Sequence, residues 1–247
     1  MLTLELRNLS LKLGNRYLVS GLNWQVRQGE FWCVLGRNGA GKSTLLHSLS
    51  GLQSIDHGSV LIMDRSVEDF TLIELARLRG LMPQQLIDRF SATVGDTVAI
   101  ARAPWRLGSA WRDDDHSYIT AALQRVGMVD RIDDDVMHLS GGERQRVSFA
   151  AMLVQNPALM LLDEPCSHQD IAQQQLMMRL MQELAVDHAV IASCHDINLA
   201  ARFASHVLLL GEGFYYAGST QEVLNPGVLS RVYGCEFDAT AKSIVAV

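Results

Sequence analysis

A glycine-rich segment that ends in a lysine and two hydroxyl residues stands directly after an apolar run. It fits the pattern GxxxxGK[ST] and consists of Gly36, Arg37, Asn38, Gly39, Ala40, Gly41, Lys42, Ser43 and Thr44. The apolar run before it, residues 31–35, is typical of a buried parallel strand, and residues 43–49 are typical of the helix that follows. Strand, loop and helix in this order predict a phosphate-binding loop.

The residue types in this loop suit a nucleotide. The glycines allow backbone N–H groups to close around phosphate oxygens, and the start of the following helix adds a partial positive charge. We expect Lys42 to reach the β- and γ-phosphates and the Ser43 hydroxyl to ligate Mg²⁺. The alternative is a glycine-rich turn after a core strand with no ligand, and the remaining motifs argue against it.

Two adjacent carboxylates end a second apolar run. Residues 158–162 predict a strand, and Asp163 and Glu164 follow it directly. In phosphate-loop ATPases a strand-end aspartate holds the magnesium, which we expect of Asp163 through the water shell of the ion. Glu164 is then placed to orient and deprotonate the attacking water. A strand can end in Asp-Glu without such a role, but the phosphate loop upstream favours the catalytic interpretation.

A second anion-binding pattern begins another helix, and it consists of Leu139, Ser140, Gly141, Gly142 and Glu143. Glycines at a helix start leave its first N–H groups free for an anion, and the serine hydroxyl adds a donor. Because a phosphate loop already serves the nucleotide within the chain, this segment is interpreted as a cap on a nucleotide held by a second copy.

With LSGGE in this place, the chain resembles the ATP-binding-cassette ATPases over essentially its whole length. The resemblance implies ATP and Mg²⁺ as ligands and a homodimer with two ATP molecules between the copies, each phosphate loop facing the other copy's residues 139–143. It assigns Gln84 to sensing magnesium and the γ-phosphate, and His195 to contacting the γ-phosphate. Asp170 matches a residue that serves communication across the dimer.

The chain departs from the family pattern at two places. An aromatic residue usually stands before the residue matching Gly14 and stacks on adenine, whereas here Leu13 stands there and the nearest aromatic is Tyr17. Both remain candidates for the adenine contact, and Leu13 is preferred because of its position. Gln169 replaces an apolar residue at the dimer seam, which leaves the strength of dimer coupling open.

A finer resemblance concerns the transported molecule. Residues 101–105, 194–202, 222–226 and 232–234 are similar to segments of the ATPases of siderophore, haem and cobalamin importers. This implies membrane permease subunits as partners, a periplasmic or surface binding protein in the full system, and a peripheral location at the cytoplasmic face of the inner (plasma) membrane. The rival functions are an exporter or lipoprotein-release ATPase, a soluble cassette protein of DNA repair or translation, and a simple phosphate-loop kinase.

Charge and composition narrow these functions. The formal net charge of −6 over 247 residues comes without a basic patch, so nucleic acid is not expected as a ligand. No apolar run approaches the length of about 20 residues that spans a bilayer, so we expect a soluble chain that reaches a membrane through a partner. The four cysteines lack CxxC spacing and are expected as free thiols, mostly buried, in a reducing cytosol.

The pattern along the chain predicts a single α/β domain with a RecA-like phosphate-loop core. Residues 1–85 and 143–247 are expected to form that core together with an N-terminal β-subdomain of short strands and turns, up to about residue 35. Residues 86–142 show little strand signal and are expected to form an inserted α-helical subdomain. Alternating strands and helices after residue 143 predict a mostly parallel sheet whose ligands lie at the carboxyl ends of the strands.

Overall fold

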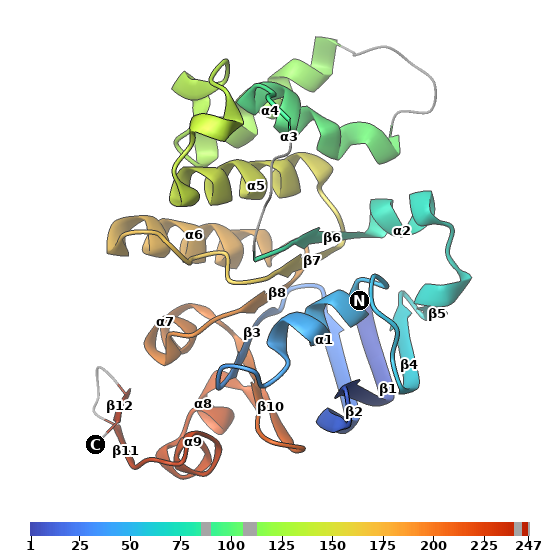
Figure 1. Cartoon of the computed structure of the whole chain (residues 1–247), viewed down its shortest axis with the longest axis vertical. Helices are drawn as coiled ribbons and strands as arrows, with labels where there is room; N and C mark the ends of the chain where they lie inside the picture. Colours follow the sequence, from blue (N-terminus) through green and yellow to red (C-terminus); the bar gives the residue numbers. More distant parts are fainter. Residues whose placement is uncertain (85–89, 106–112, 240–243, 247) are drawn as a thin grey trace.

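A computed structural model describes residues 1–84, 90–105, 113–239 and 244–246 of the chain, without the side chains of 113–115, 239, 245 and 246. No helix within these residues is long and apolar enough to cross a membrane. The expected start of the helical subdomain at residue 86 lies outside the described residues. Among the described residues the strands form sheets of four, six and two strands, here named the N-terminal sheet, the central sheet and the C-terminal hairpin (Figure 1).

The N-terminal sheet is antiparallel and has the order β2-β1-β4-β5. Its strands are β1 (Leu2–Leu13), β2 (Arg16–Arg27), β4 (His57–Ile62) and β5 (Arg65–Ser66). The expectation of short strands was wrong, because β1 and β2 each run for 12 residues. Register shifts between β1 and β2 interrupt the alternation of apolar and polar positions, so the sequence pattern breaks although the strands continue.

The central sheet has the order β10-β9-β3-β8-β7-β6 and is parallel except for β10, as the alternating pattern predicted. Its strands are β3 (Phe31–Gly36), β6 (Arg79–Met82), β7 (Leu159–Leu162), β8 (Ala189–Ser193), β9 (His206–Leu210) and β10 (Tyr215–Ser219). Strands β3, β7 and β8 are buried throughout because both faces of the sheet are covered. Because these three strands are parallel, their carboxyl ends lie at the same edge of the sheet.

The two faces of the central sheet belong to two different cores. On one face Phe31 and Leu35 pack with residues of α5 (Gly141–Gln155), α6 (Ile171–Leu184) and α7 (Ile197–Phe203). On the other face Trp32 and Val34 pack with α1 (Lys42–Leu49) and the N-terminal sheet. Helix α1, which begins at the glycine-rich loop, is thus fixed between the two sheets.

Between β6 and α5 the structure describes a mostly helical region at residues 90–105 and 113–140. It contains α3 (Val94–Ala99) and α4 (Asp113–Arg125), which pack on α5 at the top of Figure 1. The remaining helices are α2 (Leu72–Leu78), α8 (Thr220–Val223), α9 (Pro226–Tyr233) and the 3₁₀ helices η1 (Val67–Asp69), η2 (Ile100–Trp105), η3 (Val129–Arg131) and η4 (Val136–His138). Helix α5 begins at Gly141, so it crosses the boundary expected between residues 142 and 143. The division into subdomains stays a prediction.

The described cysteines are free thiols in environments that differ. Cys33 and Cys194 are buried, Cys166 is half-buried and Cys235 is exposed. Burial raises the pKa of Cys166 to about 12 and that of Cys194 to about 11. Both side chains are therefore neutral thiols at physiological pH and react slowly as nucleophiles.

Candidate functional site

The glycine-rich loop joins β3 to α1 through backbone conformations that glycine adopts readily. Gly36, Gly39 and Gly41 have φ values of 149°, 76° and 97°. A Cβ on Gly36 would lie 2.7 Å from the carbonyl oxygen of Leu210, and a Cβ on Gly41 would lie 2.9 Å from Cβ of Leu18. The loop therefore needs glycine at both positions for its conformation and for its close packing against the neighbouring strands.

Lys42, the first residue of α1, is only 6% exposed. Its Nζ donates hydrogen bonds to the carbonyl oxygens of Gly36 at 2.9 Å and Arg37 at 3.3 Å. Burial lowers the pKa of Lys42, and the nearby carboxylates of Glu164 and Asp163 act in the opposite direction. The ammonium group is thus held against the loop by backbone oxygens, with two acidic side chains close enough to favour its charge.

Ser193, at the end of β8, hydrogen-bonds to both residues that follow β7, to the side chain of Asp163 and to the backbone of Glu164. The Ser193 hydroxyl donates to Oδ1 of Asp163 at 2.6 Å and accepts a hydrogen bond from the backbone N–H of Glu164 at 2.8 Å. Asp163 is almost fully buried. Sequence reasoning missed Ser193, although it is the polar residue that ends an otherwise apolar strand beside the carboxylate strand. Its position at the end of that strand is the signal in the sequence that could have identified Ser193 as a site residue.

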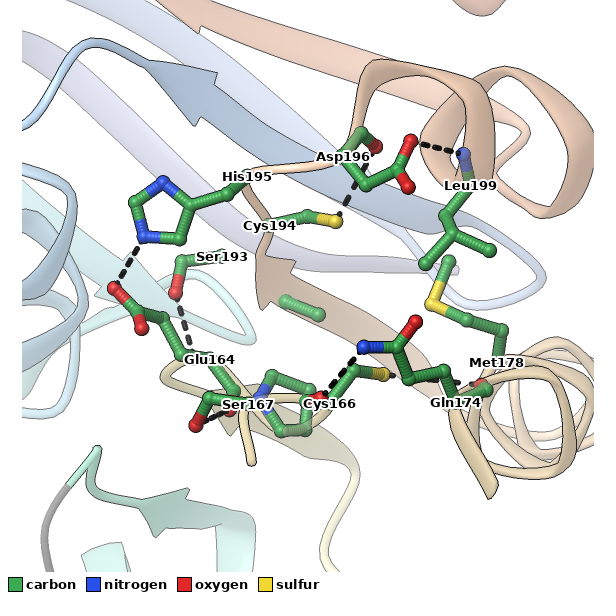
Figure 2. A pocket seen from close by; sticks show the side chains of 12 residues that line it. Glu164, Cys166, Ser167, Gln174, Met178, Ser193, Cys194, His195, Asp196 and Leu199 are labelled. Carbon is green, nitrogen blue, oxygen red and sulfur yellow. Dashed lines mark hydrogen bonds and ion pairs between the residues drawn. The ribbon is translucent and has the colours of Figure 1, made fainter. Parts of the chain in front are cut away.

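Glu164 faces His195, which follows β8 (Figure 2). His195 Nε2 lies 2.6 Å from Glu164 Oε1, and the Glu164 side chain is 15% exposed while that of His195 is 48% exposed. Glu164 has a φ of 50°, in the left-handed region that non-glycine residues rarely occupy. The turn that follows supports it, because Ser167 Oγ and Gln145 Nε2 both donate to its carbonyl oxygen.

A polar cavity of about 460 Å³ lies over the glycine-rich loop. It is lined by Leu13, Leu18, Asn38, Gly39, Gly41, Lys42, Ser43, Thr44, Gln84, Glu164 and His195. The structure therefore brings together the phosphate loop, the strand-end glutamate and the predicted glutamine and histidine, which come from distant parts of the chain. Arg37 is exposed, whereas Ala40 and Asp163 are buried, and none of the three lines the cavity.

The segment from Leu139 to Glu143 does not line this cavity. Leu139 is buried, while Ser140 is exposed and forms the N-cap of α5. Ser140 and Glu143 form a capping box, in which Ser140 Oγ accepts from the Glu143 N–H and donates to Glu143 Oε2 at 2.7 Å. Asp170 caps α6 by accepting the N–H of Gln173 at 2.9 Å. Within one chain these residues stabilise helix starts away from the phosphate loop.

Leu13 and Tyr17, the two candidates for the contact with adenine, differ in whether they line the cavity. Leu13 is 66% exposed and lines the cavity, whereas Tyr17 does not line it. Tyr17 pairs across the β1–β2 hairpin with Lys12, whose Nζ lies 4.3 Å from the centre of the tyrosine ring. Leu13 pairs with Arg16, so it lies one position along the hairpin from the Lys12–Tyr17 pair.

The residues present fit a nucleotide phosphate and a hard divalent cation. The loop presents Lys42 and the start of α1 to the cavity, as anion binding requires. The Ser43 hydroxyl, the Gln84 amide and the Glu164 carboxylate line the cavity and offer oxygen ligands, which Mg²⁺ prefers over nitrogen or sulfur. Asp163, the neighbour of Glu164, is buried and does not itself line the cavity.

The capping box predicts a specific pH dependence of stability. Hydrogen bonds from Ser140, and then the contact with Arg131, lower the pKa of Glu143 from 4.5 to about 2. A carboxylate with a lowered pKa stabilises the folded state above pH 4.5, and this contribution is lost as the pH falls towards 2. In denaturant titrations, the free-energy difference between the wild type and Glu143→Gln should therefore shrink over this range. A difference that stays constant from pH 5 to pH 2 would contradict the assignment.

The chain matches the family described as ABC transporter over residues 19–167. It is 36% identical over 230 residues to the ferric enterobactin transport ATP-binding protein FepC of Escherichia coli K12, covering 92% of this chain and 85% of FepC. It is 39% identical over 227 residues to the hemin import ATP-binding protein HmuV of Streptomyces coelicolor, covering 91% of this chain and 81% of that protein.

A solved ATP-binding cassette, a dimer in a post-hydrolysis state with ADP and Pi bound, superposes with a TM-score of 0.77. It is 26% identical, and the match covers 87% of this chain and 98% of that one. The site geometry, the family match and the identity to two transport ATP-binding proteins lead to one conclusion: this chain belongs to the ABC transporter family, as one of its ATP-hydrolysing ATP-binding proteins.

Proposed function

We propose that this chain is the ATPase subunit of an importer that takes up an iron chelate or haem through a membrane permease. The single observation that carries the ATPase part is the cavity that Lys42 shares with the Glu164–His195 pair. The importer part is supported by the names of FepC and HmuV, each similar over more than nine-tenths of this chain. Cobalamin, the third substrate expected from the sequence, appears in neither name.

The proposed chemistry assigns one task to each residue around the cavity. The Lys42 ammonium and the loop N–H groups hold the β- and γ-phosphates. Magnesium, when bound, neutralises charge that develops on the phosphate oxygens, and Ser43, Gln84 and Asp163 would hold it. Glu164 takes a proton from the attacking water, and His195 fixes the orientation of that carboxylate through the 2.6 Å contact. Ser193 keeps Asp163 and the Glu164 backbone in register.

We also propose that the second half of each site comes from another copy of the chain. The Ser140 end of α5 is exposed and does not line the cavity of its own chain. A symmetric pair can place this helix start over the phosphate loop of the partner, because a two-fold interface brings each patch to its counterpart. The permease would hold two such copies at the cytoplasmic face of the inner membrane, with a binding protein delivering the substrate on the other side.

Replacing Glu164 tests both the chemistry and the transport. Glu164→Gln should retain ATP binding but lower turnover by roughly 10²–10⁴, which is the usual contribution of a general base. In vesicles that hold the co-purified permease, the wild type should drive ATP-dependent uptake of a ferric siderophore or haem, and the variant should not. Near-normal hydrolysis by Glu164→Gln would show that another group activates the water. Active hydrolysis by the wild type without uptake of either substrate would contradict the importer assignment.

Mixing two inactive variants tests the shared site. Ser140→Arg should bind ATP as a monomer yet fail to hydrolyse it, and Lys42→Ala should lose nucleotide affinity because a charge on the phosphates is removed. In a 1:1 mixture half of the dimers are mixed and each has one intact site, so activity should return to at most about one quarter of the wild-type rate. Full activity of Ser140→Arg alone would rule out a site shared between copies.

We propose that Leu13, and not Tyr17, contacts the adenine base. Tyr17→Ala should then change ATP affinity by less than about two-fold, and discrimination between ATP and GTP should be poor, because no aromatic ring stacks on the base. Leu13→Tyr should restore stacking and tighten ATP binding by about five-fold or more. Direct titration with ATP and GTP, with folding checked by circular dichroism, measures both. A loss of five-fold or more in Tyr17→Ala would return the role to Tyr17.

A further inference from the structure

The side chain of Asn198 in α7 forms hydrogen bonds with the C-terminal hairpin. The hairpin consists of β11 (Phe237–Ala239) and β12 (Ile244–Ala246), and it lies beside α9 in Figure 1. Asn198 Nδ2 donates to the carbonyl oxygen of Ile244 at 3.2 Å, and the Ile244 N–H donates to Asn198 Oδ1 at 2.8 Å. The amide thus pairs with both backbone groups of one residue, which fixes the position and the direction of β12 against α7.

Asn198 stands three residues after His195, at the beginning of α7. Asp196 caps this helix, and its Oδ1 accepts the backbone N–H groups of Asn198 at 2.7 Å and Leu199 at 3.1 Å. The position of His195 is therefore linked through one capped helix turn to the residue that holds the hairpin. His195 in turn contacts Glu164 at 2.6 Å.

Another side of this turn borders a cavity. A space of about 120 Å³ separates the turn from α6, and its lining includes Cys194, Asp196 and Leu199 on one side and Gln174 and Met178 on the other (Figure 2). Side chains beside such a space lack partner atoms on that side. The turn that carries His195 is therefore less tightly packed on the side of this cavity.

The same C-terminal segment also reaches the phosphate loop. Tyr233, the last residue of α9, is half-buried, and its ring lies 5.6 Å from that of Phe237 in β11. Burial raises the pKa of Tyr233 to about 12, while the backbone N–H of Gly36, at the start of the loop, faces the hydroxyl and acts in the opposite direction. The C-terminal segment thus runs near the start of the phosphate loop and is hydrogen-bonded to the helix after His195.

We propose that Asn198 is a positioning residue, which through the C-terminal hairpin sets the place of His195 relative to the phosphate loop. This rests on the proposed ATPase site, and Asn198 itself does not line the nucleotide cavity. Without the two hydrogen bonds, α7 loses its attachment to the hairpin and His195 no longer holds Glu164 in one orientation. Nucleotide binding, which depends on the phosphate loop, is retained.

The experiment compares Asn198→Ala with a matched control, Asn23→Ala. Asn23 also uses both ends of its amide, accepting the N–H of Asn8 at 3.0 Å and donating to the carbonyl oxygen of Gly21 at 3.1 Å, but it lies in β2. ATPase kinetics and thermal unfolding are measured for both variants and the wild type. Asn198→Ala should lower kcat by about three- to ten-fold with KM for ATP changed less than about two-fold. Asn23→Ala should leave both unchanged.

Equal kcat in Asn198→Ala and the wild type would overturn the positioning role, and so would an equal loss of kcat in the control. Should Asn198→Ala fail to fold, Asn198→Asp replaces it, because the carboxylate still accepts the Ile244 N–H but cannot donate to its carbonyl oxygen. A folded Asn198→Asp with wild-type kcat would also overturn the proposal. Absence of ATP hydrolysis by the wild type would instead contradict the proposed function, which keeps the two failures apart.

Discussion

The buried ammonium group of Lys42 is the interaction on which the rest of the site depends. A cation that leaves water is costly unless its donors are satisfied, and here the carbonyl oxygens of Gly36 and Arg37 accept its hydrogen bonds. Those carbonyl groups point at Lys42 only because the loop turns back on itself after β3. Gly36 must also approach Leu210 more closely than any side chain permits. Packing of the central sheet thereby fixes the loop.

The order of strands in the central sheet then decides which side chains meet that loop. Strand β8 lies between β3 and β7, so the residues after all three strands gather at one edge. Lys42 follows β3 through the glycine-rich loop, and Asp163 and Glu164 follow β7 directly. Ser193 ends β8, and His195 stands two residues after it. Ser193, in the middle strand, hydrogen-bonds to the Asp163 side chain and to the Glu164 backbone. The Asp163 carboxylate is therefore held in the interior, while the Glu164 carboxylate is left to face His195.

Helix α5 joins the LSGGE segment to the loop after Glu164. A Cβ on Gly142 would lie 2.9 Å from the carbonyl oxygen of His168, so glycine lets this loop pack directly on the helix start. Gln145, one turn further along, donates to the Glu164 carbonyl oxygen and to Ser167 Oγ. A partner nucleotide bound at Ser140 would therefore act on a helix already hydrogen-bonded to the residue proposed as general base. This physical connection lies within one chain and complements the connection proposed for Asn198.

Local patterns in the sequence determined the elements that carry the chemistry. The apolar run before Gly36, the strand ending in Asp163 and Glu164, and the helix that begins at the LSGGE segment are each visible within about ten residues, because turns, strands and caps are set by neighbours in the chain.

Only the tertiary structure decided which of these elements meet. Ser193 is marked in the sequence only as the polar residue that ends an apolar strand, and its role arises because β8 lies beside β7. Leu13 lines the cavity while Tyr17 does not, although both stand in the same hairpin, because Tyr17 pairs with Lys12 and Leu13 lies one position further along, on the other face. The attachment of Ile244 to Asn198 joins residues 46 positions apart. Contacts of this kind depend on strand order and packing, which arise from the whole chain and not from any single segment.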